Sequence, residues 1–244
     1  MSKQQQNNMT DYESVIVTHV DNPTLFYCRI EQDIERYEQL KQLIVQHIDS
    51  EPHSMPDLFR CRNSSSPITA LVYSDIHSDW CRARLISMKI DRNHKPICAK
   101  VWLIDFGSIE FIAWKPKFVS TSTLEIDTFN ESRGLCFPCS LDNIKPFNDD
   151  DNDVKAESKK PLQCEWTSYA NFMFKKTTAS KKFLLKMMKS NDDLLLEDKK
   201  IIVCDLLIEN DCSKLNEFTK SSSSSMSKFL VESKVAQFIN EKKF

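Results

Sequence analysis

One pair of cysteines has a spacing that proteins use for metal binding and for redox chemistry. Cys136 and Cys139 form a C-x-x-C motif. A structural zinc site needs two further ligands, and no second pair with metal-ligand spacing follows. A redox motif usually opens a helix after a strand, whereas this one precedes an extended run interrupted by Pro138. We therefore expect no metal and no cofactor.

The other polar residues do not form a recognisable catalytic set. The five histidines are scattered, and none belongs to an H-x-x-x-H pair. Gly107 and Gly134 are the only glycines, too few for a loop that wraps a phosphate with its backbone. No Ser/His/Asp or Cys/His combination stands out. These observations predict a protein that is not an enzyme.

Composition and charge are those of an ordinary globular protein. Hydrophobic residues make up 41% of the chain, and the formal net charge is −2. The nine cysteines are odd in number and irregularly spaced, which predicts free thiols in a reducing compartment. The start of the chain lacks an apolar signal core, and no apolar run approaches the ~20 residues that span a bilayer. We expect a cytoplasmic location without membrane insertion.

The first fifty residues predict a hairpin followed by a helix. Val15–Val20 and Leu25–Ile30 are rich in β-branched and aromatic residues, and turn residues separate them. From Asp33 onward, apolar residues recur at helical spacing, and two prolines after residue 50 forbid continuation. The apolar positions of this expected helix are Ile34, Tyr37, Leu40, Ile44 and Ile48.

The middle of the chain predicts a small, strongly bent barrel. Short strand-like segments follow one another closely, with turn residues between them. They are Ile68–Tyr73, Trp80–Met88, Ile97–Asp105 and Ile109–Ile112.

The last part of the chain mixes strands and helices. We expect extended structure in Leu135–Leu141, a helix around Trp166–Met173, a second short helix in Phe183–Met188, a buried strand in Lys200–Ile208 and a closing helix in Phe229–Ile239. Because the barrel lies between these segments and the opening hairpin, both flanks together can form one body that holds the barrel as an insertion.

The central segment carries a known pattern. Two stretches resemble the core of the Tudor family: Trp80-Cys81-Arg82-Ala83 and, later in the chain, Val101–Glu110. The usual form of this core is W-Y-R-A followed by Y-I-D-Y-G-N-x-E. Three further segments resemble the flanks of extended Tudor domains: the opening hairpin, Cys139–Pro146 and Phe229–Ala236. The resemblance covers roughly residues 12–240.

The resemblance implies a β-rich α+β fold, in which a five-stranded Tudor barrel is inserted into a split staphylococcal-nuclease-like OB-fold with flanking helices. Residues 1–10 would be a disordered tail, 11–60 the first part of the nuclease-like half with a linker helix, 61–120 the barrel core, and 121–244 the second part. Germline members of the family bind peptide tails of Piwi-class Argonautes that carry symmetrically dimethylated arginine, and they act as scaffolds in germ granules of small-RNA (piRNA) pathways.

The family's binding site is an aromatic cage, because a methylated guanidinium gains cation–π and dispersion contacts on ring faces. By resemblance, its four aromatic positions fall on Tyr73, Cys81, Leu103 and Phe106, and its asparagine position falls on Ser108. Two of the four rings are thus present. Cys81 and Leu103 leave two walls without a π-face.

Three further residues are expected to support the barrel instead of touching a ligand. By resemblance, Arg82 and Asp105 form an ion pair between strands, and Trp80 is a packing residue. Trp102 is a candidate to replace a missing wall, but strand alternation argues against this, because it turns Trp102 away from the face that Leu103 holds.

The interpretation that follows is a peptide-binding adaptor with weak or no dependence on arginine methylation, located in the cytoplasm in perinuclear germ granules. Two alternatives remain open. One is an OB-type module that binds RNA through the lysines of an expected helix from Lys175 to Lys189, which could also be a solvated surface. The other is a scaffold with a vestigial cage and a partner that docks elsewhere.

Overall fold

The computed structural model describes residues 12–50, 69–93, 95–114, 118–120, 134–147, 165–179, 181–188, 195–196, 199–208 and 225–239. The expected tail of residues 1–10 lies outside them. The chain divides into two compact units. One unit joins Met1–Glu31 to Phe137–Phe244, and the other runs from Gln32 to Cys136.

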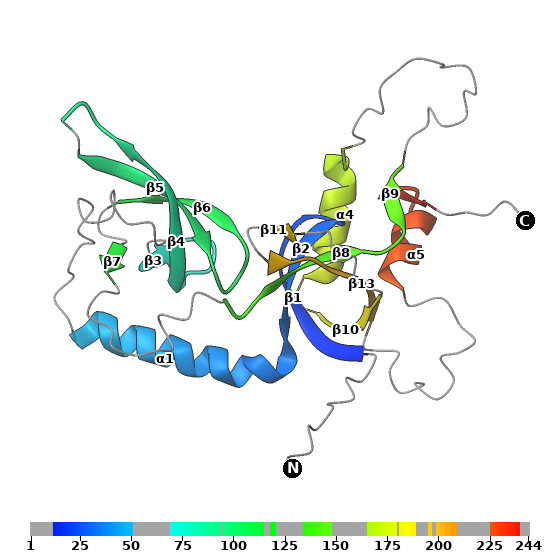
Figure 1. Ribbon diagram of the computed structural model, residues 1–244, viewed down its shortest axis with the longest axis horizontal. Helices are drawn as coiled ribbons and strands as arrows, with labels where there is room; N and C mark the ends of the chain where they lie inside the picture. Colours follow the sequence, from blue (N-terminus) through cyan, green and yellow to red (C-terminus); the bar gives the residue numbers. More distant parts are fainter. Residues whose placement is uncertain are drawn as a thin grey trace, which may run out of the picture. The chain divides into compact units, whose positions relative to one another are not determined.

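The unit that runs from Gln32 to Cys136 contains an antiparallel sheet of five strands in the order β6-β5-β4-β3-β7 (Figure 1). The strands are β3 (Thr69–Ser74), β4 (Asp79–Ile90), β5 (Pro96–Leu103), β6 (Ile109–Ala113) and β7 (Phe118–Ser120). Alternate residues on neighbouring strands form one apolar cluster that includes Val72, Ala83, Val101 and Ile112. The four predicted strands are confirmed, and β7 adds a fifth at the edge.

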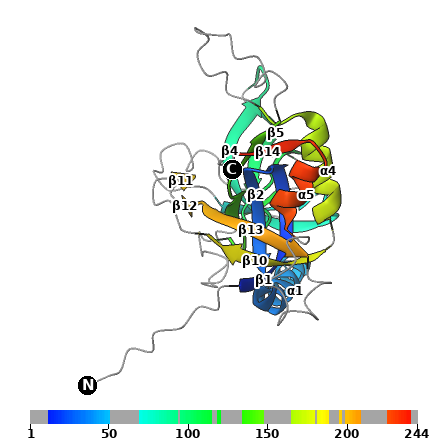
Figure 2. The same ribbon diagram turned by 90° about the vertical axis from the view of Figure 1, so that its right-hand side faces the viewer.

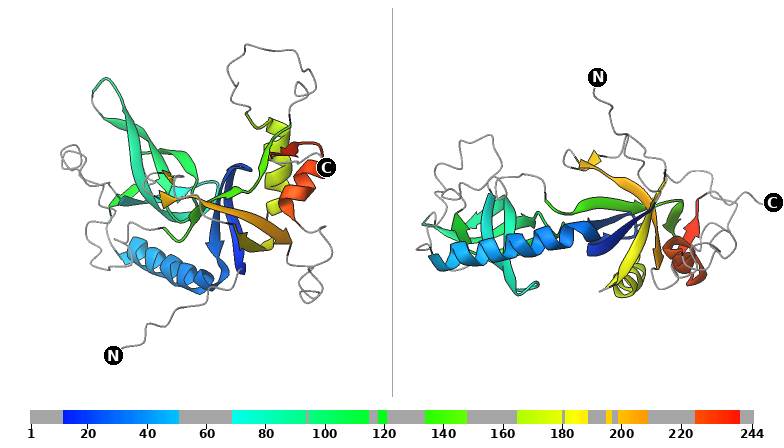
Figure 3. Two further views of the ribbon diagram at one scale, coloured as in Figure 1. Left: turned by 45° about the vertical axis from the view of Figure 1, so that its right-hand side comes forward. Right: turned by 90° about the horizontal axis from the view of Figure 1, so that it is seen from below.

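Helix α1 (Ile34–Ser50) precedes this sheet and belongs to the same unit. Figure 3 shows it running along one side of the sheet. Leu40 and Ile44 are buried against Leu71 of β3 and Leu135, with Tyr37 and Ile48 partly buried beside them. Four of the five predicted apolar positions therefore face the sheet, and this unit extends beyond the predicted core of 61–120.

The other unit is built on a closed five-stranded barrel in the order β1-β10-β13-β8-β2. Its strands β1, β2, β10 and β13 are labelled in Figure 2. Strands β2 and β8 are paired although the entire other unit lies between them in the sequence. The barrel is therefore split in sequence and continuous in space, as predicted. Its strands are β1 (Tyr12–Asn22), β2 (Leu25–Ile30), β8 (Phe137–Leu141), β10 (Lys182–Met187) and β13 (Ile202–Ile208).

Two helices pack on this barrel. In α4 (Ser168–Thr178), the Thr167 side chain accepts a hydrogen bond from the backbone N–H of Ala170 and caps the first turn. Its Phe174 is fully buried and meets Phe26 of β2 edge to face, with ring centroids 5.2 Å apart. In α5 (Met226–Glu232), Ser225 is the N-cap and its hydroxyl also donates to Asp205 of β13. These contacts explain why both helices form where they do.

The expected short helix at Phe183–Met188 is wrong, because these residues form strand β10. Phe183 and Leu185 alternate into the barrel core, and β10 pairs with both β1 and β13. The expected lysine-bearing helix from Lys175 to Lys189 is wrong for the same reason: Lys175 and Lys176 lie on α4, whereas Lys182 and Lys186 lie on β10. Lys189 lies outside the described residues.

The expected closing helix at Phe229–Ile239 is partly wrong. Helix α5 begins earlier and ends at Glu232, where Lys234 adopts a left-handed φ of 57°. The Val235 N–H then bonds back to the Leu230 carbonyl oxygen, a common way to close a helix. The chain continues as β14 (Ala236–Phe238), which pairs with β9 (Ile144–Pro146). A separate pair joins β11 (Leu195–Leu196) and β12 (Lys199–Lys200).

Among the described residues, no helix combines the length and the apolar character that crossing a membrane requires.

Candidate functional site

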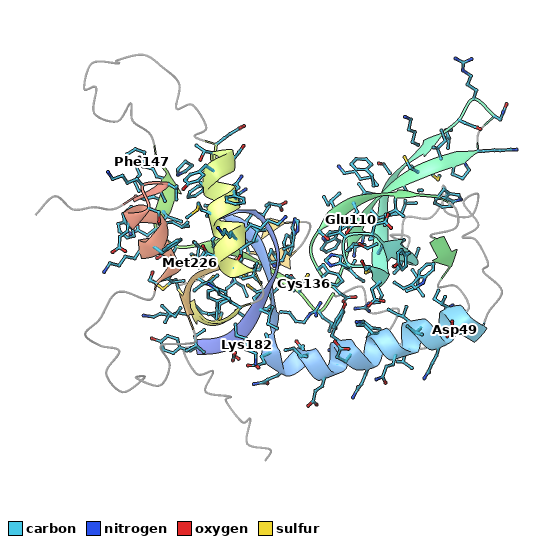
Figure 4. The ribbon with its side chains drawn as sticks, turned by 180° about the vertical axis from the view of Figure 1, so that it is seen from behind. Asp49, Glu110, Cys136, Phe147, Lys182 and Met226 are labelled. Atoms are coloured by element: carbon cyan, nitrogen blue, oxygen red, sulfur yellow. The ribbon has the colours of Figure 1, made fainter. Side chains whose placement is uncertain are left out.

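The candidate site lies where two turns of the sheet unit come together. The first turn joins β3 to β4 and contains His77, and the second joins β5 to β6 and contains Phe106. Ser74 shapes the first turn, because its hydroxyl accepts the His77 backbone N–H at 3.1 Å and donates to the Glu110 carboxylate at 2.9 Å. Figure 4 shows Glu110 among the side chains of this unit.

The second turn is held by backbone hydrogen bonds and by one glycine. Gly107 has a φ of 85°, a conformation that favours glycine, and its N–H donates to the Leu103 carbonyl oxygen at 2.8 Å. The Leu103 N–H donates to the Ser108 carbonyl oxygen at 2.8 Å. Phe106 is thereby presented at the tip of a short, tightly bonded turn.

A buried ion pair anchors this turn to strand β4. Arg82 donates to Asp105 through Nη2 at 2.6 Å and through Nε at 2.9 Å, and both side chains are buried. The Leu135 N–H donates to the same carboxylate at 3.0 Å. At the neighbouring Gly134, an added Cβ would lie 1.5 Å from the Ile104 carbonyl oxygen, so no larger residue fits. These residues position the turn and are not exposed to a ligand.

Phe106 contacts two other rings. The His77 imidazole stacks on it, with ring centroids 3.7 Å apart and planes inclined by 24°. Tyr37 of α1 meets it edge to face at 5.8 Å. The His77 Nε2 lies 3.8 Å from the Glu110 Oε1, so a buried carboxylate flanks the stacked rings. A ring face beside a buried negative charge is a setting that suits a planar cation.

Cys81 and Leu103 lie together behind Phe106. Both are buried in the apolar cluster of the sheet, against which Phe106 packs. Burial, followed by the negative charge of Asp79, raises the pKa of the Cys81 thiol to about 12. This thiol is therefore neutral at physiological pH and contributes neither a charge nor a π-face.

Tyr73 lies apart from Cys81. It is paired across the strands with Trp80, and the two rings meet edge to face at 5.8 Å. The next pair, Val72 and Cys81, points to the opposite face of the sheet, because side chains alternate along a strand. Trp80 packs with the cluster formed against α1. The structure therefore brings Phe106, Cys81 and Leu103 together and places Tyr73 with Trp80.

Ser108 is buried beside the second turn, with 4% of its surface exposed. Its Oγ has no hydrogen-bond partner within the part of the chain that the structure describes. Buried polar atoms are usually bonded, so this hydroxyl keeps unused hydrogen-bonding capacity at a position that solvent does not reach.

Sequence reasoning missed His77 and Tyr37. His77 sits in the loop between Tyr73 and Trp80, so its position in the first turn was a usable signal. Tyr37 has the helical spacing of a core residue, and that pattern alone gives no sign of a contact with Phe106.

The two thiols of the C-x-x-C motif lie in different surroundings. The Cys136 thiol donates to the Ile104 carbonyl oxygen at 3.3 Å. Cys139 is buried in the barrel core with Cys28 and Cys204, and burial raises the pKa of Cys28 and Cys139. The cysteines in the described ranges are free, and no group of three or more His, Cys, Asp or Glu residues there could hold a metal ion.

A family model for the Tudor domain matches residues 7–143, more than half of the chain. The chain belongs to the Tudor domain family. A search of curated proteins finds no match.

Solved extended Tudor domains share the fold of this Tudor protein. The extended Tudor domain of human TDRD1, solved with a symmetrically dimethylated peptide, is 17% identical with a TM-score of 0.63, covering 98% of this chain and 95% of that one. The domain of Drosophila melanogaster Papi, solved with an unmethylated Piwi N-terminal peptide, is 13% identical with a TM-score of 0.65, covering 94% and 100%. Domain TD3 of mouse TDRD1, solved with a dimethylarginine MILI peptide, is 14% identical with a TM-score of 0.60, covering 94% of each chain. The likeness establishes an extended Tudor fold.

Proposed function

We propose that this chain is a non-enzymatic adaptor that binds an arginine side chain of an extended peptide at Phe106, with weak or no dependence on arginine methylation. The observation that carries the proposal is the stack of His77 on Phe106 beside the Glu110 carboxylate. The His77 imidazole is a planar group that carries nitrogen atoms. It lies on the face of the Phe106 ring, and its Nε2 is near the Glu110 carboxylate. A guanidinium would make the same kinds of contact.

The low dependence on methylation follows from the walls of this site. Methyl groups on the guanidinium gain affinity by lying against ring faces, about 0.5–2 kcal/mol for each good contact. Cys81 and Leu103 provide no ring face, and His77 occupies a face of Phe106. The loss of such contacts weakens the preference for the methylated form roughly tenfold or more.

The partner class comes from the relatives. Papi has been solved with both methylated and unmethylated Piwi N-terminal peptides, and TDRD1 with methylated peptides. By analogy, the ligand here is an arginine-containing tail of a Piwi-class Argonaute or of another germ-granule protein in a piRNA pathway, and the adaptor acts in cytoplasmic, perinuclear germ granules.

Calorimetric titration with matched arginine–glycine peptides tests the proposal. We expect the unmethylated and symmetrically dimethylated forms to bind with similar affinity. Phe106→Ala should abolish measurable binding, and Phe106→Leu, which keeps the apolar bulk, should weaken it nearly as much. A clearly higher affinity for the dimethylated peptide would overturn the prediction of weak or no dependence on methylation. If a folded Phe106→Ala variant bound the peptide as tightly as the unmodified chain, the partner would have to bind at another surface. That result would support the alternative of a scaffold with a vestigial cage.

A further inference from the structure

The sheet unit has a solvent-facing surface that the peptide site does not use. Residues paired directly across antiparallel strands point to the same side, so the register of β4, β5 and β6 defines three rows on one face. We name this the outer face. Its rows are Arg84–Trp102–Ile109, Ser87–Lys100–Phe111 and Lys89–Cys98–Ala113.

The outer face carries exposed aromatic and aliphatic side chains, although Trp102 is buried, with 5% of its surface exposed. Phe111 is 74% exposed and Ile109 is 52% exposed. The intervening residues Glu110 and Ile112 are buried on the opposite side, where the apolar cluster lies. Packing within this unit therefore does not account for a large ring at position 111.

The charge of the outer face has one sign. Its rows contain three basic residues, Arg84, Lys89 and Lys100, and no acidic residue. Two of the cations lie over rings: Arg84 lies 5.3 Å from the centroid of Trp102, and Lys100 lies 6.0 Å from that of Phe111. The whole chain is slightly acidic, with a net charge of −2, so these cations are concentrated locally.

We propose that the outer face binds single-stranded nucleic acid. An exposed ring accepts a base by stacking, and guanidinium planes do the same, whatever the base. Cations beside the rings contact phosphates. Successive rows are about 6.8 Å apart along the strands, twice the rise of about 3.4 Å per phosphate in a stacked strand. In this assignment, Phe111 and the Arg84 guanidinium, which lies over the buried Trp102 ring, are stacking platforms, and Lys100 and Lys89 bind phosphates.

A peptide rich in carboxylates would satisfy the cations but would leave the face of Phe111 without a stacking partner. The aromatic component therefore favours nucleic acid over an acidic protein segment. This site is independent of the peptide site, because Glu110 and Ile112 point to the opposite side of β6 from Ile109 and Phe111.

Fluorescence anisotropy with the full chain tests the proposal. The probes are labelled uridine-rich RNA and thymidine-rich DNA oligonucleotides of about 12 nucleotides, a length within the range of small single-strand-binding folds. We expect binding at low salt that weakens with a slope of about −1.4 in log affinity against log salt, from the two phosphate contacts of Lys100 and Lys89. Tighter binding of RNA than of DNA would show contacts to the 2′-hydroxyl, and equal binding would show recognition of the shared backbone and bases.

Variants separate stacking from charge. Phe111→Ala should weaken binding about tenfold or more, whereas Phe111→Tyr should keep it. Lys100→Glu should also weaken binding and make the salt slope shallower. The matched control is Phe172→Ala on α4, which removes a 56% exposed ring that also lies under a lysine, Lys176 at 5.9 Å. This control should leave binding unchanged.

Absence of binding at low salt would overturn the proposal, as would binding that Phe111→Ala leaves unaltered. Capture of poly-glutamate by this face, with no oligonucleotide binding, would show a protein-docking surface and would also overturn it. Because Phe111 is mostly exposed, its variants should keep the thermal unfolding temperature and the arginine-peptide affinity of the unmodified chain.

Discussion

His77 and Phe106 stack face to face, with ring centroids 3.7 Å apart. A cation held between two rings needs each ring at about 3.5–4.0 Å, so the rings must be about 7 Å apart or more. The stack leaves no such space. His77 therefore occupies a surface of Phe106 that an arginine would use, and the ligand must displace it or bind beside it.

Removal of the imidazole should tighten peptide binding. We expect His77→Ala to bind the arginine peptide roughly two- to tenfold more tightly, because an aromatic pair of about 0.5–1.5 kcal/mol no longer has to be broken. His77→Phe keeps the stack and serves as the control, with affinity near that of the unmodified chain. Calorimetry measures both. Weaker binding by His77→Ala would show instead that the imidazole is a wall of the bound site.

The hydroxyl of Ser108 should matter for ligand binding and not for stability. It has no partner among the residues that the structure describes, so Ser108→Ala removes no internal hydrogen bond. We expect the unfolding free energy to change by less than about 0.5 kcal/mol and the peptide affinity to fall by about 0.5–1.5 kcal/mol. Denaturant titration and calorimetry give the two values. A stability loss without an affinity change would assign the hydroxyl a purely internal role.

The Arg82–Asp105 pair should be costly to break from one side. Arg82→Met leaves a buried carboxylate without its cation, and we expect a loss of about 3–5 kcal/mol in unfolding free energy. Asp105→Leu should cost a similar amount. The double variant should lose much less than the sum, because neither charge then remains buried alone. Additive losses in urea denaturation would show that the two residues act separately.

The fold should lose stability in alkali partly through Cys81. Its pKa is about 12 in the folded chain, against 9.0 for an ordinary thiol. The folded state thus holds its proton while the unfolded state releases it, so this contribution is complete below pH 9.0 and declines as the pH rises toward 12. Urea denaturation from neutral pH to about pH 10.5 should show a smaller decline for Cys81→Ala than for the unmodified chain. Equal declines would place the effect in other residues.

Much of the fold could be predicted because its strongest signals are local. The helical spacing of Leu40 and Ile44 and the turn residues between β1 and β2 each determine a structure within a short window. The insertion of one unit in the other came from the resemblance, since no local pattern pairs β2 with β8.

The errors fall where distant partners decide the structure. The run Phe183-Leu184-Leu185 suits a helix or a strand, and its pairing with β1 and β13 selects the strand. Val235–Ile239 has an apolar pattern that suits a helix, but pairing with β9 draws it into β14.

The sequence motif locates the residues of the second turn more directly than those of the first. Phe106 and Ser108 have fixed positions relative to Gly107, so the motif locates them. Which ring of the first turn reaches Phe106 depends on turn conformation, including the left-handed Ser78 with φ of 51°. Spacing alone favours Tyr73 as the aromatic residue of the first turn, whereas the ring that stacks on Phe106 is that of His77.

The split barrel has a consequence for the order of folding. Cys28 and Phe137 are paired on β2 and β8, with the whole sheet unit between them in the chain. Closing so long a loop from a random coil carries an entropic cost that local contacts cannot offset. The contacts of the sheet unit join neighbouring strands, so it can form first and shorten the effective loop. On a ribosome, the opening hairpin would then wait for the inserted unit before its barrel could close, and that interval exposes the edge of β2 to wrong partners.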